Sequence, residues 1–438
     1  MNNKTNGPLS RIVQVTTRVE PHELRAVLLS FLFVFTLMAA YFIVRPLRDA
    51  MASDWSRTET SFLWTITFSV SVVGVMAYGW IISRIRFSQV VPGIYLLFAA
   101  SFVLFYLGSS LVSDPILIDK VFYVWLSVFS LFHVSVFWSY MSGTYNREQA
   151  KRLFAVIATG ASLGAIVGPI IPSFFAECIG IMNLLLITAA MQLVPVALIP
   201  QLEKSKVADL GNAGREADLD EAKQLARNPF SGFVAFVSNP YLFAIGLFIL
   251  MYVTISTFVY MELREMLAVF ERPERTAINA RIDLVVNTLA IVTALFFTGR
   301  VASRFGVATL LAAIPLMMVG GWLIVAAVPL LGVMYGLQIV RRAGNYAVTK
   351  PGREMLFTVV SDDERYKAKP VIDICVYRGG DMVTAWFHTG LKEVLAFGLT
   401  GVALVAAVIA AIWTMAGIYL GRSYTYNSAA EHAAPVED

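Results

Sequence analysis

The stretch Gly79-Trp-Ile-Ile-Ser-Arg-Ile85, which ends one apolar run, is echoed by Gly299-Arg-Val-Ala-Ser-Arg-Phe305, which ends another run 220 residues later. A second pair of matches, Glu148-x-x-Lys151 and Glu364-x-x-Lys367, has an offset of 216 residues. Short strings of this kind recur by chance, but coordinated matches at nearly one offset indicate that the chain contains two related halves.

The composition is that of a membrane protein. Of the 438 residues, 58% are hydrophobic and 15% are charged. Soluble domains carry about 25% charged residues, so an ordinary soluble enzyme is excluded. A membrane-spanning helix needs about 20 apolar residues. Twelve such runs occur: 24–44, 61–82, 91–111, 121–141, 153–176, 181–199, 241–261, 277–298, 307–328, 330–348, 371–391 and 398–419.

The runs fall into two groups of six, separated by a polar stretch rich in charged residues. The sequence therefore predicts an all-α polytopic membrane protein with 12 transmembrane helices in two pseudo-symmetric six-helix halves. Six-span internal repeats are typical of the major facilitator fold, which binds its substrate near the midplane between the halves. The predicted segments are a cytoplasmic tail (1–23), a first half (24–199), a cytoplasmic connector (200–240), a second half (241–420) and a cytoplasmic C-terminal tail (421–438).

The positive residues outside the spans indicate the orientation. With a cytoplasmic N-terminus, the cytoplasmic segments hold 22 Lys and Arg residues and the opposite side holds nine. Because positive residues are enriched in cytoplasmic loops, both termini are predicted to be cytoplasmic. The N-terminal segment has no small-residue cleavage site and does not resemble a transit peptide. We therefore expect a multi-pass protein of a bacterial inner membrane, acting as a monomer.

The tenth and eleventh runs carry charged residues at spanning depth. Arg341 and Arg342 lie well inside the tenth run, and Asp373, Arg378 and Asp381 follow one another through the eleventh. An arginine at the bilayer centre costs about 2.5–3.5 kcal/mol, so such residues are expected to face the interior of the bundle. Arg378 and Asp381 could neutralise each other at i, i+3 spacing. Even then, a positive excess suited to an anionic ligand remains.

A second cluster of charges closes the first run, as Arg45-Pro-Leu-Arg-Asp49, and the seventh run contains Glu262. The proline removes a backbone donor and tends to kink a helix beside these charges. They are either ordinary juxtamembrane charges or parts of a binding cavity. In the second case Arg48, Arg342 and Arg378 would bind the anionic group, while acidic neighbours would hold these cations in place. The full set of candidate substrate-binding residues is Arg45, Arg48, Asp49, Glu262, Arg342, Asp373, Arg378 and Asp381.

The fifth run carries a stripe of glycines at Gly160, Gly164 and Gly168, and Gly164 maps onto Gly380 at the offset of 216 residues. Glycines spaced by four residues make a smooth helix surface that permits close packing, which is the favoured interpretation. The alternative is a resemblance to the Gly-Pro motif of drug/proton antiporters, because Pro169 follows the last glycine.

Several segments resemble the ATP/ADP translocases, the nucleotide transporters of plastids and intracellular bacteria. Arg45-Pro-Leu-Arg-Asp49 is similar to that family's Arg-Pro-Leu-Lys-Asp segment. Glu148-Gln-Ala-Lys-Arg-Leu-Phe154, followed by Gly160-Ala-Ser-Leu-Gly164, is similar to its Glu-Ala-Lys-Arg-Phe and glycine segments. Lys367-Ala-Lys-Pro-Val-Ile-Asp373, continuing to Gly380, looks like its Lys-x-Lys…Asp…Lys-Ser-Gly-Gly region. The pieces occur in the family's order across most of the chain.

The resemblance implies exchange of ATP for ADP, or of other nucleotides, through a facilitator-type fold. The family's functional cations in the first and eleventh spans fall on Arg48 and Arg378, and its acid in the seventh span falls on Glu262 or Tyr260. Its fourth-span acid falls on Leu126, so this chain departs from the family there, and the substrate could be another nucleotide or phosphorylated anion. Arginine, where better-known members have lysine, would grip phosphate oxygens at two points.

The predicted function is therefore nucleotide antiport by alternating access, with the lipid bilayer and a small anionic substrate (ATP or ADP) as partners. The alternative is a proton-coupled facilitator for another organic anion, drug or metabolite, with Asp283, Asp373 or Asp381 as proton carrier. A receptor or scaffold on the same fold is disfavoured by the cost of its interior charges. An enzyme is not expected, because the sequence has no phosphate loop, metal-ligand spacing or nucleophile–base pair. Neither a cofactor nor a nucleic-acid partner is expected.

Overall fold

The computed structural model describes residues 19–82, 87–111, 114–212, 229–361, 368 and 371–433. These described residues form helices and connecting turns, with no strand among them, and they divide into two compact units. Unit 1 holds the described residues up to Arg48, those between Ala77 and Asp220, and those from Thr276 to Leu284. Unit 2 holds the rest, including the segment Asp49–Met76.

Unit 1 is built from the helices of the first half and the middle of α11. Asp114 caps the N-terminus of α5 by accepting bonds from the backbone N–H groups of Ile116 and Leu117 at 3.0 and 3.2 Å. Asn146 and Gln149 cap α6 reciprocally, which satisfies backbone donors that a helix start leaves open. The helices are α2 (Leu24–Met51), α3 (Arg57–Ile82, its end only), α4 (Phe87–Leu111), α5 (Pro115–Thr144), α6 (Arg147–Ile179), α7 (Asn183–Ala208) and α11 (Arg272–Thr293, only its part Thr276–Leu284).

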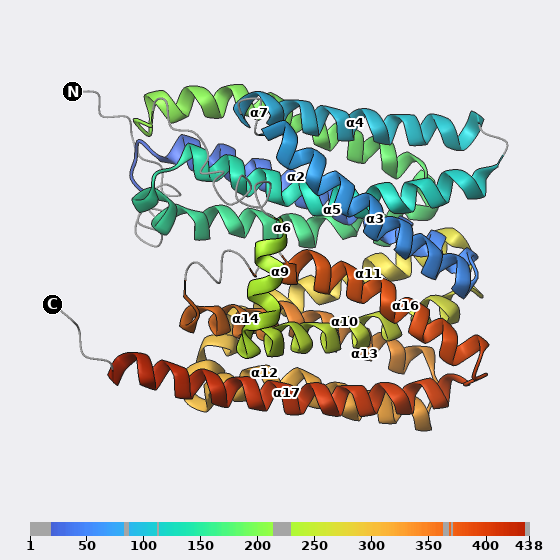
Figure 1. Cartoon of the computed structure of the whole chain (residues 1–438). Helices are drawn as coiled ribbons and strands as arrows, with labels where there is room; N and C mark the ends of the chain where they lie inside the picture. The colour runs from blue at the N-terminus through green and yellow to red at the C-terminus, as the bar shows by residue number, and fades with distance from the viewer. Residues whose placement is uncertain are drawn as a thin grey trace. The chain divides into compact units, whose positions relative to one another are not determined.

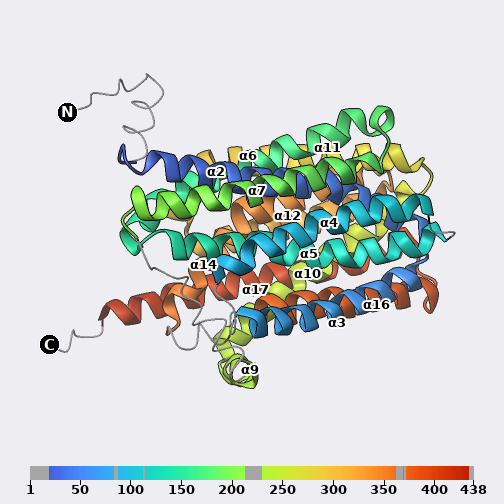
Figure 2. The ribbon, with the colours of Figure 1, turned by 90° about the horizontal axis from the view of Figure 1, so that it is seen from above.

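Unit 2 contains the remaining helices, among them the start of α3. The short α9 runs crosswise to the other helices of this unit, and α12 lies along α17 (Figure 1). Figure 2 shows α3 beside α16, where Ser61 and Thr389 share a hydrogen bond of 2.9 Å. The further elements are η1 (Ala52–Asp54), α9 (Pro229–Ser238), α10 (Pro240–Leu267), η2 (Ala294–Thr298), α12 (Gly299–Ala327), α13 (Leu331–Gly344), η3 (Asn345–Thr349), α14 (Lys350–Leu356), η4 (Phe357–Val359), η5 (Val371–Val376), α16 (Tyr377–Glu393) and α17 (Leu399–Ala433).

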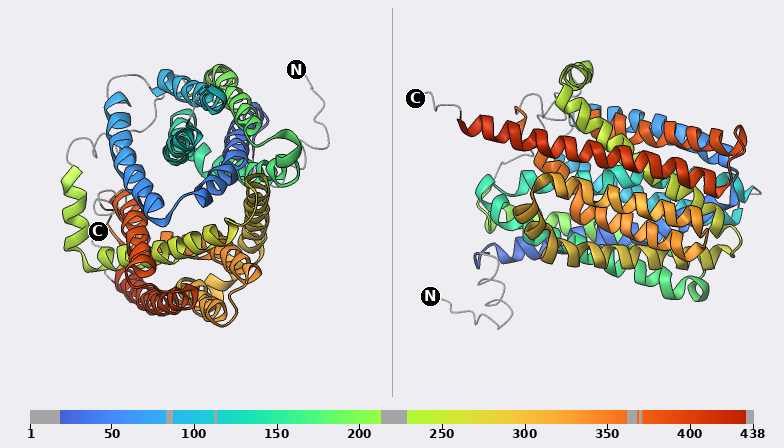
Figure 3. Two further views of the ribbon diagram at one scale, coloured as in Figure 1. Left: turned by 90° about the vertical axis from the view of Figure 1, so that its right-hand side faces the viewer. Right: turned by 90° about the horizontal axis from the view of Figure 1, so that it is seen from below.

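Equivalent helices pack together in the two units, as an internal repeat requires. In unit 1, α4 packs along α7, and in unit 2 the corresponding α12 packs along α17 (Figure 3). Gly164 of α6 lies against the backbone of α2 at Phe35. Gly380 of α16 lies against Leu250 and Val253 of α10. The fifth span thus meets the first at the position where the eleventh meets the seventh.

The glycine stripe of α6 packs closely on α2, so the favoured interpretation of the stripe is confirmed. A Cβ atom at Gly160 would lie 2.6 Å from the carbonyl oxygen of Phe31, and one at Gly168 would lie 2.5 Å from that of Ala39. Real Cβ atoms essentially never come that close to another heavy atom. Only glycine lets the two backbones approach in this way.

Ten helices in the described part are long and apolar enough to cross a membrane. The two other predicted spans fall on α13–η3–α14 and on η5–α16, which are interrupted by π-helical turns. These same segments carry the interior charges, Arg341 and Arg342 in one and Arg378 and Asp381 in the other. The charges make these two segments less apolar than the other ten.

The connections between spans are described in part. The eighth span is separated from the ninth at Gly306, whose φ of +78° and ψ of 172° only glycine adopts without strain. Within the predicted connector, α7 continues to Ala208 and α9 begins at Pro229, while 213–228 lie outside the described residues. The matching residues Ser83, Arg84, Glu364 and Lys367 also lie outside the described residues.

Candidate functional site

Arg341 is a buried cation whose hydrogen-bond partners among the described residues are all neutral. It is 4% exposed, near the end of α13. Its Nε and Nη2 donate to Oε1 of Gln338 at 3.2 and 2.7 Å. Its Nη1 donates to the hydroxyls of Ser256 and Tyr252 on α10, at 2.5 and 3.4 Å. The guanidinium is therefore held in place by four donor contacts, and no carboxylate is among its acceptors.

The surroundings of Arg341 combine positive charge with aromatic rings. Arg342 follows it and is 5% exposed. The π-helical turn η3 begins three residues later, and such turns are frequent at functional sites. Tyr252 lies with its ring 6.0 Å from that of Tyr377 on α16 and 5.8 Å from that of Trp413 on α17. Unit 2 therefore brings two buried cations and three aromatic rings close together.

The predicted residues of the eleventh span lie in the same unit. Arg378 and Asp381 are half-buried in the first two turns of α16. Asp373 lies in the π-helical η5, just before that helix, and its side chain is outside the described part of the structure. Both groups of charges thus lie next to a π-helical turn. Arg341 and Arg342 come just before η3, and Arg378 comes just after η5.

Arg45 and Arg48, at the end of the first span, lie in unit 1. Arg45 forms an ion pair with Asp283 of α11, with 3.3 Å between Nη1 and Oδ1. Arg48 donates to Oγ of Ser127 at 3.5 Å and lies over the ring of Tyr123, 5.3 Å from its centroid. Ser127 and Tyr123 lie on α5 close to Leu126, the residue that stands where the resemblance places an acid. Leu126 itself is fully buried.

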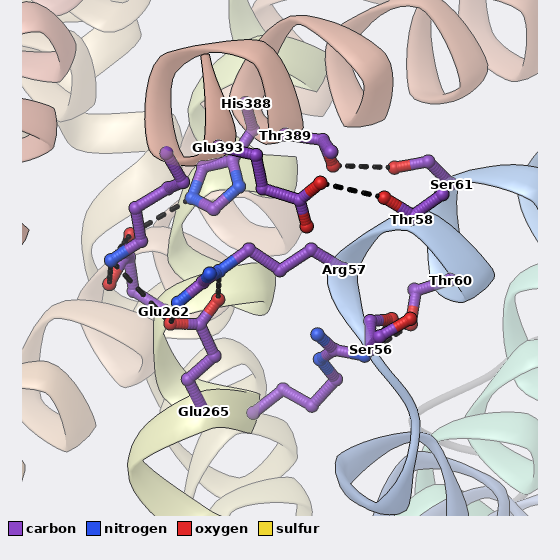
Figure 4. A network of polar contacts seen from close by, with 12 residues as sticks. Ser56, Arg57, Thr58, Thr60, Ser61, Glu262, Glu265, His388, Thr389 and Glu393 are labelled. Atoms are coloured by element: carbon purple, nitrogen blue, oxygen red, sulfur yellow. Dashed lines mark hydrogen bonds and ion pairs between the residues drawn. The ribbon is translucent and has the colours of Figure 1, made fainter. Parts of the chain in front are cut away.

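Glu262 contacts two residues that the sequence did not single out. It is 2% exposed in α10. Its Oε1 is 2.9 Å from Nε2 of His388, and Nζ of Lys392 lies 3.0 Å from Oε1 and 3.1 Å from Oε2 (Figure 4). A histidine 126 residues away along the chain gives no sequence signal, but the i, i+4 spacing of His388 and Lys392 on one face of α16 was visible.

The start of α3 is joined to α10 and α11 by further charged contacts inside unit 2. Arg57 binds Glu265 at two points, Nη2 to Oε2 at 2.8 Å and Nε to Oε1. Arg264, 4% exposed, donates to the carbonyl oxygens of Ala52 and Trp55 at 2.9 and 3.2 Å. Arg272 and Arg275 bind Asp54 on either side, each at 2.6 Å. Asp49, the first residue of the Asp49–Met76 segment, is half-buried.

These contacts sort the predicted residues into separate places. Arg45 and Arg48 lie in unit 1, whereas Asp49, Glu262, Arg342, Arg378 and Asp381 lie in unit 2. Glu262 is bound by His388 and Lys392 in the described structure, and Arg45 is bound by Asp283. In the described part of the chain, no three His, Cys, Asp or Glu side chains are grouped to hold a metal ion.

The comparisons with known proteins agree with this architecture. The family model of the Major Facilitator Superfamily matches residues 27–340, more than half of the chain. A solved structure with a similar fold is that of a bacterial homologue of the human lysosomal transporter Spinster, in an inward-facing and unoccupied conformation. The two chains are 12% identical with a TM-score of 0.57, over 93% of this chain and 99% of that one. No curated protein matches the sequence.

Proposed function

The chain belongs to the major facilitator superfamily, and we propose that this membrane transporter exchanges nucleotides, or similarly charged phosphorylated anions, by alternating access. It is a multi-pass membrane protein and a transporter rather than an enzyme. The proposal adds the class of cargo, the exchange mode, a location in a bacterial inner membrane and cytoplasmic termini. The ends of α2 and α10 then face the outside, as does the start of α3.

The single observation that carries the anionic cargo is Arg341. A cation at spanning depth has a cost of about 2.5–3.5 kcal/mol, and such residues usually mark a substrate path. Neutral hydroxyl and amide partners orient the guanidinium of Arg341 but leave its charge without a carboxylate among the described residues. An anionic substrate would supply the negative countercharge. A guanidinium presents a planar fork of donors that matches phosphate geometry.

A nucleotide is favoured over a simple anion by the rings beside this cation. The hydroxyl of Tyr252 accepts a hydrogen bond from Arg341, and its ring lies 6.0 Å from the ring of Tyr377. Aromatic faces bind flat bases by stacking, worth about 1–3 kcal/mol per base in other nucleic-acid sites. The resemblance of Arg45–Asp49 and of Glu148–Gly164 to nucleotide transporters supports the same cargo. A different organic anion of similar charge is the alternative, and it would use the same arginine.

Binding to the purified protein in detergent tests the proposal. ATP should bind to the unmodified protein by titration calorimetry, and Arg341→Gln should weaken binding at least about tenfold, or about 1.4 kcal/mol. The matched control is Arg304→Gln, which removes an equal charge from an exposed position on α12, and it should bind ATP normally. Equal affinity of Arg341→Gln and Arg304→Gln would contradict the role of Arg341. If ATP does not bind but another organic anion does, and Arg341→Gln weakens the binding of that anion, the alternative cargo is favoured.

A further inference from the structure

Glu262 and His388 form a buried pair in unit 2, and Lys392 binds the same carboxylate. His388 is completely buried, and its ring meets the ring of Phe258 edge-on at 5.2 Å between centroids. The Nε2 atom faces Oε1 of Glu262 (Figure 4). A carboxylate would repel a phosphate placed here, so this pair requires a separate explanation.

The hydrogen bond fixes where a proton can enter. A neutral imidazole that donates from Nε2 to a carboxylate has its lone pair on Nδ1. Nδ1 of His388 is buried and has no hydrogen-bond partner within the described structure. The ring therefore offers one vacant proton acceptor, and the resulting imidazolium would lie directly beside the negative charge of Glu262. Histidine is the side chain that ordinarily changes its charge between about pH 5 and 8.

The charged groups around the pair come from three helices. Among the described residues, Glu262 and Glu265 lie on α10, Lys392 and Glu393 on α16, and Arg57 on α3. Beyond them, Asp54 is bound by Arg272 and Arg275, and the exposed Glu59 accepts a bond from the backbone of Ser56. A proton added to His388 would change the charge balance of this cluster first at Glu262 and Lys392.

Lys392 connects the pair to the start of α3. Its Nζ lies 3.0 Å from Glu262 and 3.5 Å from Glu265, and Glu265 is the carboxylate that binds Arg57. Once His388 is positive, it competes with Lys392 for Glu262. Lys392 then shifts its attraction toward Glu265, where it competes with Arg57. Protonation of His388 thereby weakens the Arg57–Glu265 contact, which joins α3 to α10.

We propose that Glu262 and His388 form the site for a coupling proton, and that Lys392 and Glu265 transmit its presence to Arg57. The step transfers one proton from hydronium to Nδ1 of His388 and releases water, while the Nε2–H bond to Glu262 is kept. The inference depends on the protein being a transporter and not on a nucleotide as cargo. The acids predicted from sequence as proton carriers differ from this pair, and one of them, Asp283, is bound by Arg45.

The decisive experiment follows the start of α3 as the pH changes, without any substrate. Spin labels at Phe62→Cys in α3 and at Val269→Cys just after α10, both exposed and both in unit 2, report the distance between these segments in the full-length protein in which Cys178 and Cys375 are replaced by serine. As the pH is lowered, the distance distribution should shift. In His388→Gln, which retains a donor toward Glu262 but takes up no proton, the shift should disappear. The control His133→Gln, another buried histidine that is not beside an acid, should keep it.

A second measurement follows the proton on His388 directly. Ring NMR of labelled histidine in the unmodified protein should show the His388 signal, identified by its absence from the His388→Gln spectrum, gaining a proton as the pH falls. Failure of His388 to titrate, or a pH-dependent shift that persists in His388→Gln, would overturn the proposal.

Uptake into liposomes distinguishes failure of the proposed proton site from failure of the proposed nucleotide cargo. With labelled ATP outside liposomes that are loaded with ADP, an imposed proton gradient should change the uptake rate by about tenfold or more, a coupling of ordinary allosteric size. In His388→Gln, the ratio of driven to undriven uptake should fall to about one. If the unmodified protein transports no ATP, the proposed cargo fails, whereas the pH-dependent distance still decides the proton site.

Discussion

Arg57 and Glu265 form a two-point ion pair that joins the first residue of α3 to the last turn of α10, with Nη2 and Oε2 2.8 Å apart. Their side chains are 34% and 22% exposed. The pair lies within unit 2, although α3 ends in unit 1. The pair therefore holds the start of α3 against the end of α10 within this unit.

Loss of this pair should lower the stability of the protein. Arg57→Gln or Glu265→Gln should lower the free energy of unfolding by an amount between the ~1 kcal/mol of exposed pairs and the ~3 kcal/mol of buried ones. The exchanged pair Arg57→Glu with Glu265→Arg should recover part of the loss. Thermal denaturation in detergent measures both, and a double variant no better than the sum of its single changes would contradict the pairing.

The glycine stripe of α6 yields a stability prediction with an internal control. Gly164→Ala places a methyl group against the carbonyl oxygen of Phe35, so we expect a loss of about 1–3 kcal/mol from overpacking. Gly93→Ala in α4 meets nothing within 4 Å and should be neutral or slightly stabilising, because alanine favours helix. Similar melting temperatures for the two variants would show that α2 and α6 are not so closely packed.

The Arg45–Asp283 ion pair predicts a non-additive result. Arg45→Met leaves Asp283, whose side chain is 3% exposed, without this partner and should cost about 3 kcal/mol or more. Replacing both residues, as Arg45→Met with Asp283→Leu, should cost less than the single change, since no carboxylate then remains buried. Melting of the three variants in detergent measures the difference, and a double variant as unstable as the sum of both single variants would contradict the pairing.

The proposed orientation can be checked with the native cysteines. Cys178 lies at the end of α6 and is exposed, and both termini are proposed to be cytoplasmic. In a Cys375→Ser variant, a membrane-impermeant maleimide should label Cys178 in intact cells. A cysteine at Tyr426, 77% exposed in α17, should react only in inverted vesicles. The opposite labelling pattern would contradict the proposed topology.

Much of the fold is encoded in patterns that depend on one segment at a time. Apolar run length places the spans, because a helix must cover the hydrocarbon core with apolar side chains. The common offset of Gly164 and Gly380 correctly indicates that both halves pack the same way. The tenth and eleventh spans were found despite their charges because those charges lie between apolar flanks.

The contacts of the candidate site depend on pairs of segments and could not be predicted. Nothing near Arg341 in the sequence indicates that Ser256 and Tyr252, some 85 and 89 residues away, will be its acceptors. His388 is one of four histidines, and only the packing of α16 against α10 places it beside Glu262. The start of α3 likewise binds α10 through side chains whose partners are set by tertiary structure.

The central claim is exchange of a phosphorylated anion through a site that contains Arg341. Its most direct test is uptake of labelled ATP by purified protein in liposomes that are either empty or loaded with ADP, compared between the unmodified protein and Arg341→Gln. The account predicts rapid uptake only when ADP is inside, and loss of that uptake in Arg341→Gln. Uptake that is absent under both conditions from folded protein, or that is equally fast without internal ADP, would contradict nucleotide exchange.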